Sequence, residues 1–122
     1  MAGVARFQLV ALDTPDPEGL ARFYADLTGW EIEPHDADDG WVQLRSGSGA
    51  TIAFQRAPDH VPPRWPDAGH PQQLHLDFEV DDLDRGETDV LALGARKAEF
   101  QPGTSFRVYL DPAGHPFCLV ID

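Results

Sequence analysis

The chain has 122 residues, enough for one domain that removes roughly two-thirds of its unfolded surface from water. Nine basic residues against 21 acidic ones give a formal net charge of -12, which disfavours nucleic acid and anionic membrane surfaces as partners. One cysteine excludes a disulfide within the chain, and no segment has the apolar length of a secretion signal or a membrane helix, so we expect a cytoplasmic protein.

A strand followed by a helix is expected at the start of the chain. Residues 7–12 are a short apolar run, and the turn residues after it end in an N-cap carboxylate, Asp16, and a proline at the first helical position. Gly29 then stands where a helix C-terminus needs a positive φ. Between them, the apolar residues recur at helical spacing and form one face for packing on a sheet: Leu20, Phe23, Tyr24 and Leu27.

Two further strands are expected in the first half, at residues 41–45 and 51–56, around the Gly-rich turn 46–49. Residues 57–72 then hold five of the eleven prolines, which disfavours both a helix and a central strand. We interpret this segment as a linker that crosses the molecule.

The second half follows the same order. Residues 73–80 alternate polar and apolar side chains, as in a half-buried strand, and Asp81 or Asp82 caps the helix that follows. Gly94 ends this helix, whose buried side carries Leu83, Val90 and Leu93. The closing strands are expected at residues 106–110 and 117–121.

The two halves match in spacing. Asp16 precedes Gly29 by 13 positions, as Asp81 precedes Gly94, and the run Gly49–Ala53 corresponds to Gly114–Cys118. We therefore predict an α+β domain built from tandem βαβββ modules around one shared cavity. The expected boundaries are 7–56 for module one, 57–72 for the linker and 73–121 for module two.

Two motifs carry a family resemblance. The helix end at residues 23–30 (Phe-Tyr-Ala-Asp-Leu-Thr-Gly-Trp) and the turn at residues 111–117 (Asp-Pro-Ala-Gly-His-Pro-Phe) closely resemble the vicinal oxygen chelate superfamily, which includes glyoxalase I, bleomycin-resistance proteins and extradiol dioxygenases. Segments 53–56, 64–66 and 72–77 resemble its bacterial glyoxalase-like branch. The resemblance covers nearly the whole chain and implies a curved, cupped mixed sheet with helices on the outer face, and a homodimer.

For metal-using members, the resemblance implies ligands on the first and last strands of each module, typically His, Gln or Glu. In module one these positions fall on Leu9, or Val10 if the register shifts by one, and on Ala53, and none of these binds a metal. Module two supplies His75 and Cys118. Because two protein ligands hold a divalent ion weakly, we expect no catalytic metal. A divalent metal stays possible if Gln55, on the Ala53 face, joins the two.

The polar face of residues 73–80 carries His75 and Asp77, about 6.5 to 7 Å apart along an extended strand. In the resembled fold this face lines the cavity, where the pair could hold a ligand or perform acid-base catalysis. The alternative is a histidine that is satisfied by its neighbouring carboxylate, with no further role.

Four other residues are candidates for ligand binding. Gln55 shares its strand face with Ala53, and Trp65, among prolines, could form an aromatic wall or lid. Trp65 could equally fill the module junction or a dimer contact. Cys118 lies in an apolar strand, where a cysteine usually behaves as a small buried hydrophobe. His115 lies in the Gly-His-Pro turn, either at the cavity mouth or simply at the surface.

Three functional interpretations remain. In the first, the cavity binds a small, partly apolar molecule without a catalytic metal, through Leu9, Ala53, Gln55, Trp65, His75, Asp77, His115 and Cys118. In the second, the protein is an enzyme, either a metal-dependent lyase, isomerase or dioxygenase of the glyoxalase I or extradiol type, or a metal-free one that uses His75 and Asp77. In the third, it is a dimerisation module with a vestigial cavity.

Overall fold

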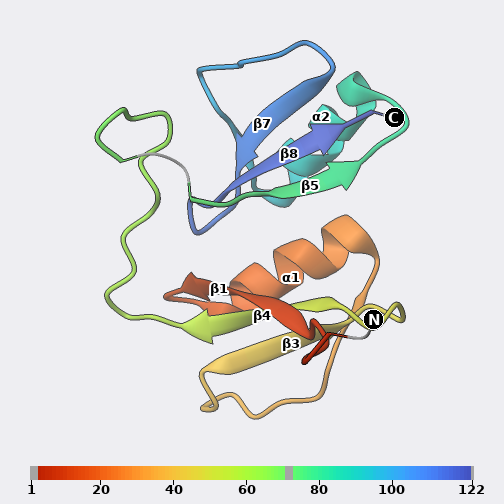
Figure 1. Cartoon of the computed structure of the whole chain (residues 1–122), viewed down its shortest axis with the longest axis vertical. Helices are drawn as coiled ribbons and strands as arrows, with labels where there is room; N and C mark the ends of the chain where they lie inside the picture. Colours follow the sequence, from red (N-terminus) through yellow and green to blue (C-terminus); the bar gives the residue numbers. More distant parts are fainter. Residues whose placement is uncertain (1–2, 71–72, 122) are drawn as a thin grey trace. The chain divides into compact units, whose positions relative to one another are not determined.

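The structure, a computed structural model, describes residues 3–70 and 73–121, and the chain divides into two compact units, 1–60 and 61–122. Each unit is one α-helix and a four-stranded mixed sheet, and the strand orders are equivalent, β1-β4-β3-β2 and β5-β8-β7-β6 (Figure 1). In each sheet the first strand pairs in parallel with the last. The predicted α+β fold with tandem βαβββ modules is confirmed.

The first unit contains β1 (Leu9–Thr14), α1 (Pro17–Thr28), β2 (Glu31–Ile32), β3 (Trp41–Arg45) and β4 (Thr51–Arg56). The second unit contains β5 (Leu76–Glu79), α2 (Leu83–Leu93), β6 (Arg96–Lys97), β7 (Phe106–Leu110) and β8 (Pro116–Val120). Between β4 and β5, the described residues form neither helix nor strand, as their prolines predict.

Both helices begin and end where their capping residues predict. The Asp16 carboxylate accepts a hydrogen bond from the Gly19 backbone N–H at 3.1 Å, and Gly29 ends α1 with φ of 77°. Of the two candidates for the second cap, it is Asp82 that accepts from the Arg85 N–H. Gly94 ends α2 with φ of 112°.

The strands differ more from expectation. The predicted β3, β4 and β7 have the observed bounds, and β8 begins and ends one residue earlier than predicted. Strand β1 is displaced by two residues because pairing with β4 extends through Thr14, whereas Phe7 is 74% exposed. Strand β5 is shorter than residues 73–80 because pairing with β8 begins at Leu76, and Leu74, expected to be buried, is 59% exposed. The two-residue strands β2 and β6 are too short to show a periodic pattern, and the prediction missed them.

Aromatic side chains fill both cores between helix and sheet. In the first unit, Tyr24 of α1 stacks on Phe54 of β4 with ring centroids 5.6 Å apart. In the second, Tyr109 and Phe117 stack at 5.7 Å. Helix α2 lies so close to the sheet that a Cβ on Gly86 would be 3.1 Å from the Leu119 side chain, which explains a glycine in mid-helix.

Glu87 joins α2 to strands β6 and β7. One oxygen of its carboxylate accepts from the Tyr109 hydroxyl at 2.9 Å, from Lys97 Nζ at 3.0 Å and from Arg107 Nη1 at 3.3 Å. Arg107 also contacts Asp84 at 2.7 Å. The pKa of Glu87 is lowered below its usual value, first by the hydrogen bond from Lys97 and then by the hydrogen bond from Tyr109 and the positive charge of Arg107. Burial of the carboxylate opposes this shift.

We therefore expect Glu87→Gln to lower the free energy of unfolding by about 1 kcal/mol at pH 7. The pKa of Glu87 is lower in the folded state, so its contribution is present above the unfolded value of 4.5 and is lost as the pH falls through the folded value. Urea unfolding between pH 3 and pH 7 measures this, with the difference between variant and parent shrinking at low pH. Asp89→Asn, on the same helix and exposed, is the control. A pH-independent difference would contradict the assignment.

Candidate functional site

One face of the second sheet carries both polar and aromatic side chains. Tyr109, Phe117 and Leu119 point to α2, so the alternate residues of β7 and β8 occupy the opposite face, which we call the distal face. Cross-strand pairing places Asp77 and Val108 on either side of Cys118. The distal face therefore comprises His75, Asp77, Phe106, Val108, Cys118 and Val120.

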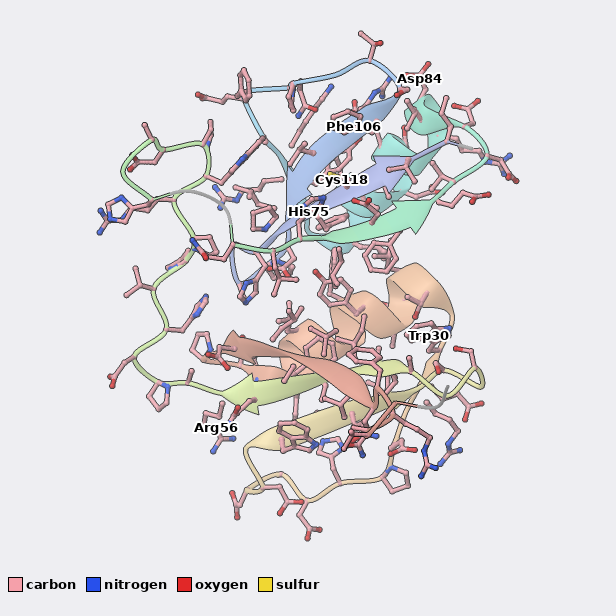
Figure 2. All side chains as sticks on the ribbon, viewed as in Figure 1. Trp30, Arg56, His75, Asp84, Phe106 and Cys118 are labelled. Atoms are coloured by element: carbon pink, nitrogen blue, oxygen red, sulfur yellow. The ribbon has the colours of Figure 1, made fainter. Side chains whose placement is uncertain are left out.

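Three potential donor atoms meet on the distal face. His75 Nε2 lies 3.2 Å from Asp77 Oδ1, and His75 is the residue directly before β5. The donor atoms of His75, Asp77 and Cys118 all lie within 4.8 Å of one another. Figure 2 shows His75 at the start of β5 and Cys118 on the neighbouring β8. Alternation along the strand placed His75 with Asp77, and the family resemblance placed His75 with Cys118, but the sequence analysis did not join all three as one set of donors.

The Cys118 thiol is held in its neutral form. Only 5% of the residue is exposed, and this burial, reinforced by the negative charge of Asp77 and by a hydrogen bond to it, raises the pKa of the thiol to about 11. At neutral pH the thiol is a weak nucleophile. It packs as a small buried side chain and donates a hydrogen bond to Asp77.

Trp65 covers the buried part of the distal face. It packs, together with Phe106 and Val120, against the cluster formed by Ala98, Val108 and Cys118. The Trp65 ring also lies 5.8 Å from that of Phe100, which is 53% exposed. Trp65 and Phe100 together form aromatic surface beside this cluster, and the role of Trp65 as a wall, a junction residue or a dimer contact stays a prediction.

A close contact holds the segment that carries Trp65. Gly114, in the turn before β8, has φ of 90°, and a Cβ built on it would lie 2.6 Å from the Pro62 Cβ. The same turn is stabilised by Asp111, whose buried carboxylate accepts from the N–H groups of Ala113 and His115 at 2.8 and 3.0 Å. Gly114 therefore lets Pro62 approach, three residues before Trp65.

The first unit has a corresponding face, away from α1, with a different chemistry. In this unit Ala11 pairs with Ala53, as Asp77 pairs with Cys118 in the second unit. Leu9, two residues before Ala11, is therefore the counterpart of His75, and Val10 is not. All three counterparts of the donor residues are aliphatic. Gln55 lies on this face and is exposed.

Sequence reasoning missed four residues around these faces. Phe106 and Val108 alternate with Arg107 and Tyr109, and this alternation could have placed them beside Cys118. Phe100 lies in a loop without periodicity and gave no signal. Trp41 lies opposite Gln55, is 36% exposed and donates from Nε1 to Gln43 Oε1 at 3.4 Å.

A comparison with protein families matches residues 9–120 to a glyoxalase-like domain. The chain belongs to the glyoxalase-like domain family. This confirms the resemblance that the two motifs carry. A comparison with curated proteins finds no match.

Solved structures share the fold at low identity. A glyoxalase/bleomycin resistance protein/dioxygenase family enzyme from Burkholderia phytofirmans PsJN is 19% identical, with a TM-score of 0.71 over 96% of this chain and 98% of that one. A glyoxalase-related enzyme from Fulvimarina pelagi is 17% identical, with a TM-score of 0.70 over 98% and 89%. TnmS3, an antibiotic binding protein from Streptomyces sp. CB03234, is 18% identical, with a TM-score of 0.62 over 99% and 98%.

The cavity shared between the two units, and the joining of Gln55 to His75 and Cys118, stay predictions. His115 lies in the turn before β8, with its N–H bound to Asp111, and is not part of the three-donor group. Within the described part of the chain, neither helix has the length and apolar character needed to cross a bilayer.

We expect Gly114→Ala to destabilise the protein by about 1 to 3 kcal/mol, because alanine strains the positive φ and its Cβ meets Pro62. Gly47→Ala is a matched control, since Gly47 has φ of 76° but nothing within 4 Å of its Cβ position. Urea unfolding followed by tryptophan fluorescence measures both. Equal effects of the two substitutions would show that the Pro62 contact contributes nothing.

We expect the single thiol to be alkylated by iodoacetamide slowly at pH 8 and faster as the pH rises toward about 11, in chelator-treated protein. Asp77→Asn removes a negative charge that raises the thiol pKa, so the variant reacts faster than the parent at pH 9. Glu79→Gln, two residues along β5, is the control. A slower or unchanged rate in Asp77→Asn would show that the carboxylate does not act on Cys118.

Proposed function

We propose that this glyoxalase-like protein binds a small, partly apolar organic molecule on the distal face of its second module, without a catalytic metal shared between the modules. The observation that carries the proposal is the cover of Trp65 over the Val108 and Cys118 cluster, next to the half-exposed pair His75 and Asp77. An aromatic wall beside a few polar groups is the usual composition of a site for small organic ligands.

The two ends of the face suit two parts of one ligand. Trp65 and Phe106 offer aromatic surface, which binds an apolar or aromatic body. The side chains of His75 and Asp77 are 40% and 54% exposed, so their remaining hydrogen-bonding capacity is accessible to a polar group of the ligand. On the first module, Gln55 and the exposed Trp41 form a pair of an amide and an aromatic side chain.

Independence from a shared metal is supported by the residues of module one. Leu9, Ala11 and Ala53 occupy the positions equivalent to His75, Asp77 and Cys118, and none has a donor atom in its side chain. A site between the modules would have to recruit Gln55, a weak neutral ligand. The homodimer and the cytoplasmic location stay predictions of this proposal.

The fold relatives support binding as a function of this architecture. TnmS3 is described as an antibiotic binding protein, and it covers nearly the whole chain. Others are described as enzymes, so the alternative is a metal-dependent lyase, isomerase or dioxygenase. The binding function and the enzyme alternative can be told apart by experiment, since only an enzyme would turn over a substrate.

Nile red, a neutral apolar dye, is a suitable first probe, with a panel of small aromatic antibiotics as competitors. We expect chelator-treated protein to bind the dye saturably, and Trp65→Ala to weaken binding at least about tenfold, equivalent to about 1.4 kcal/mol. Fluorescence titration measures the dissociation constants. Trp30→Ala, which removes an indole from the end of α1 instead, should bind as the parent does.

Two results would overturn the proposal. One is unchanged dye and antibiotic binding in Trp65→Ala that circular dichroism shows to be folded. The other is turnover of methylglyoxal–thiol adducts or catechols by protein loaded with Ni²⁺, Mn²⁺, Fe²⁺ or Zn²⁺, which would establish the enzyme.

A further inference from the structure

We propose that His75, Asp77 and Cys118 form a binding site for one thiophilic divalent cation, Zn²⁺ in the first instance, held entirely within the second module. The proposal does not rest on the binding of an organic molecule. That function depends on the aromatic cover, whereas the cation depends on the three donor atoms.

The geometry is close to what a cation requires. The three donor atoms lie within 4.8 Å of one another, and His75 Nε2 is already 3.2 Å from Asp77 Oδ1. Ligand atoms around a tetrahedral Zn²⁺ are roughly 3.3 to 3.5 Å apart, given Zn–N and Zn–O distances near 2.0 Å and Zn–S near 2.3 Å. The widest pair must therefore contract by about 1 Å. His75 and Asp77 are half-exposed, so rotation about their side-chain bonds can supply this movement.

The donor types suit zinc better than a hard cation. A thiolate and an imidazole together favour Zn²⁺ over Mg²⁺ or Ca²⁺, which prefer oxygen ligands alone. Three protein ligands leave a fourth position for water or another small ligand. The binding step is balanced by proton loss, because the cation replaces the proton that the Cys118 thiol donates to Asp77, and this proton passes to solvent.

The negative charge beside Cys118 attracts a cation and disfavours a thiolate that has no cation bound to it. The Asp77 carboxylate that holds the Cys118 proton in place attracts a positive ion to the same point, and the chain as a whole carries a formal charge of -12. Burial of Cys118 under Trp65 further shields the position of the sulfur ligand from bulk water.

This site differs from the ligand set implied by the resemblance to metal-using relatives. That set draws on both modules, and in this chain its first-module positions are Leu9 and Ala53. Here the third ligand is Asp77, which the parallel register of β5 and β8 places directly opposite Cys118. The pairing completes a three-donor group without the first module.

Titration of the chelator-treated full chain with Co²⁺ tests the proposal, since a thiolate bound to Co²⁺ gives a near-ultraviolet charge-transfer band. We expect one Co²⁺ per chain, displacement by Zn²⁺ and release of a proton. Cys118→Ser should abolish the charge-transfer band, and Asp77→Asn should weaken Co²⁺ binding at least tenfold. Glu79→Gln is the matched control, a carboxylate two residues along the same strand, and should bind as the parent does.

Three results would overturn the proposal. One is the absence of a thiolate band in folded parent protein. The second is equal weakening by Asp77→Asn and Glu79→Gln, which indicates a general effect of negative charge. The third is weakening by Gln55→Ala without weakening by Asp77→Asn, which indicates a ligand set shared with the first module. Nile red binding by the metal-free protein separates these outcomes from failure of the proposed binding function.

Discussion

The parallel pairing of the first and last strands of each module is the constraint on which the rest of the structure depends. Parallel neighbours cannot be joined by a tight turn, so the chain between them must cross over, and here the crossover contains the helix and the two remaining strands. Because the partners lie some forty residues apart, the register of their pairing decides which side chains meet. A shift of one residue would transfer Asp77 and His75 to the α2 side of the sheet and leave Cys118 without either.

The same register in both modules produces opposite surfaces. In module two it brings together an imidazole, a carboxylate and a thiol, and in module one the equivalent positions are Leu9, Ala11 and Ala53. A symmetric fold thus presents asymmetric chemistry. The helix side shows a related asymmetry, since Glu87 links α2 to β6 and β7 through charged hydrogen bonds, whereas α1 packs through Tyr24, Phe23 and Leu20. Charged hydrogen bonds thus hold the helix to the sheet in module two, the module that carries His75, Asp77 and Cys118.

Local signals predicted the helices well, and non-local pairing limited the rest. Asp16, Gly29 and Gly94 act on backbone groups within a few residues, so their effect can be inferred from sequence. The ends of β1 and β5 depend on partner strands far along the chain, and both were misplaced. His75 and Asp77 were placed on one face by alternation, but their meeting with Cys118 requires the β5–β8 register. The packing of Trp65 on the Cys118 cluster and the approach of Pro62 to Gly114 likewise join distant parts of the sequence, and no local pattern shows them.

Cys118 belongs to two arrangements whose requirements differ. As a neutral thiol it packs with Ala98 and Val108 beneath Trp65, and burial together with Asp77 keeps it protonated. As a metal ligand it must lose the proton that it donates to Asp77, and the half-exposed side chains of His75 and Asp77 must move closer to the sulfur. The first arrangement keeps the sulfur packed among apolar side chains, and the second places it beside the polar side chains of the same face. Since one sulfur cannot satisfy both at once, an organic molecule packed against Trp65 and a cation held by Asp77 would influence each other's affinity, and by linkage the influence is equal in both directions.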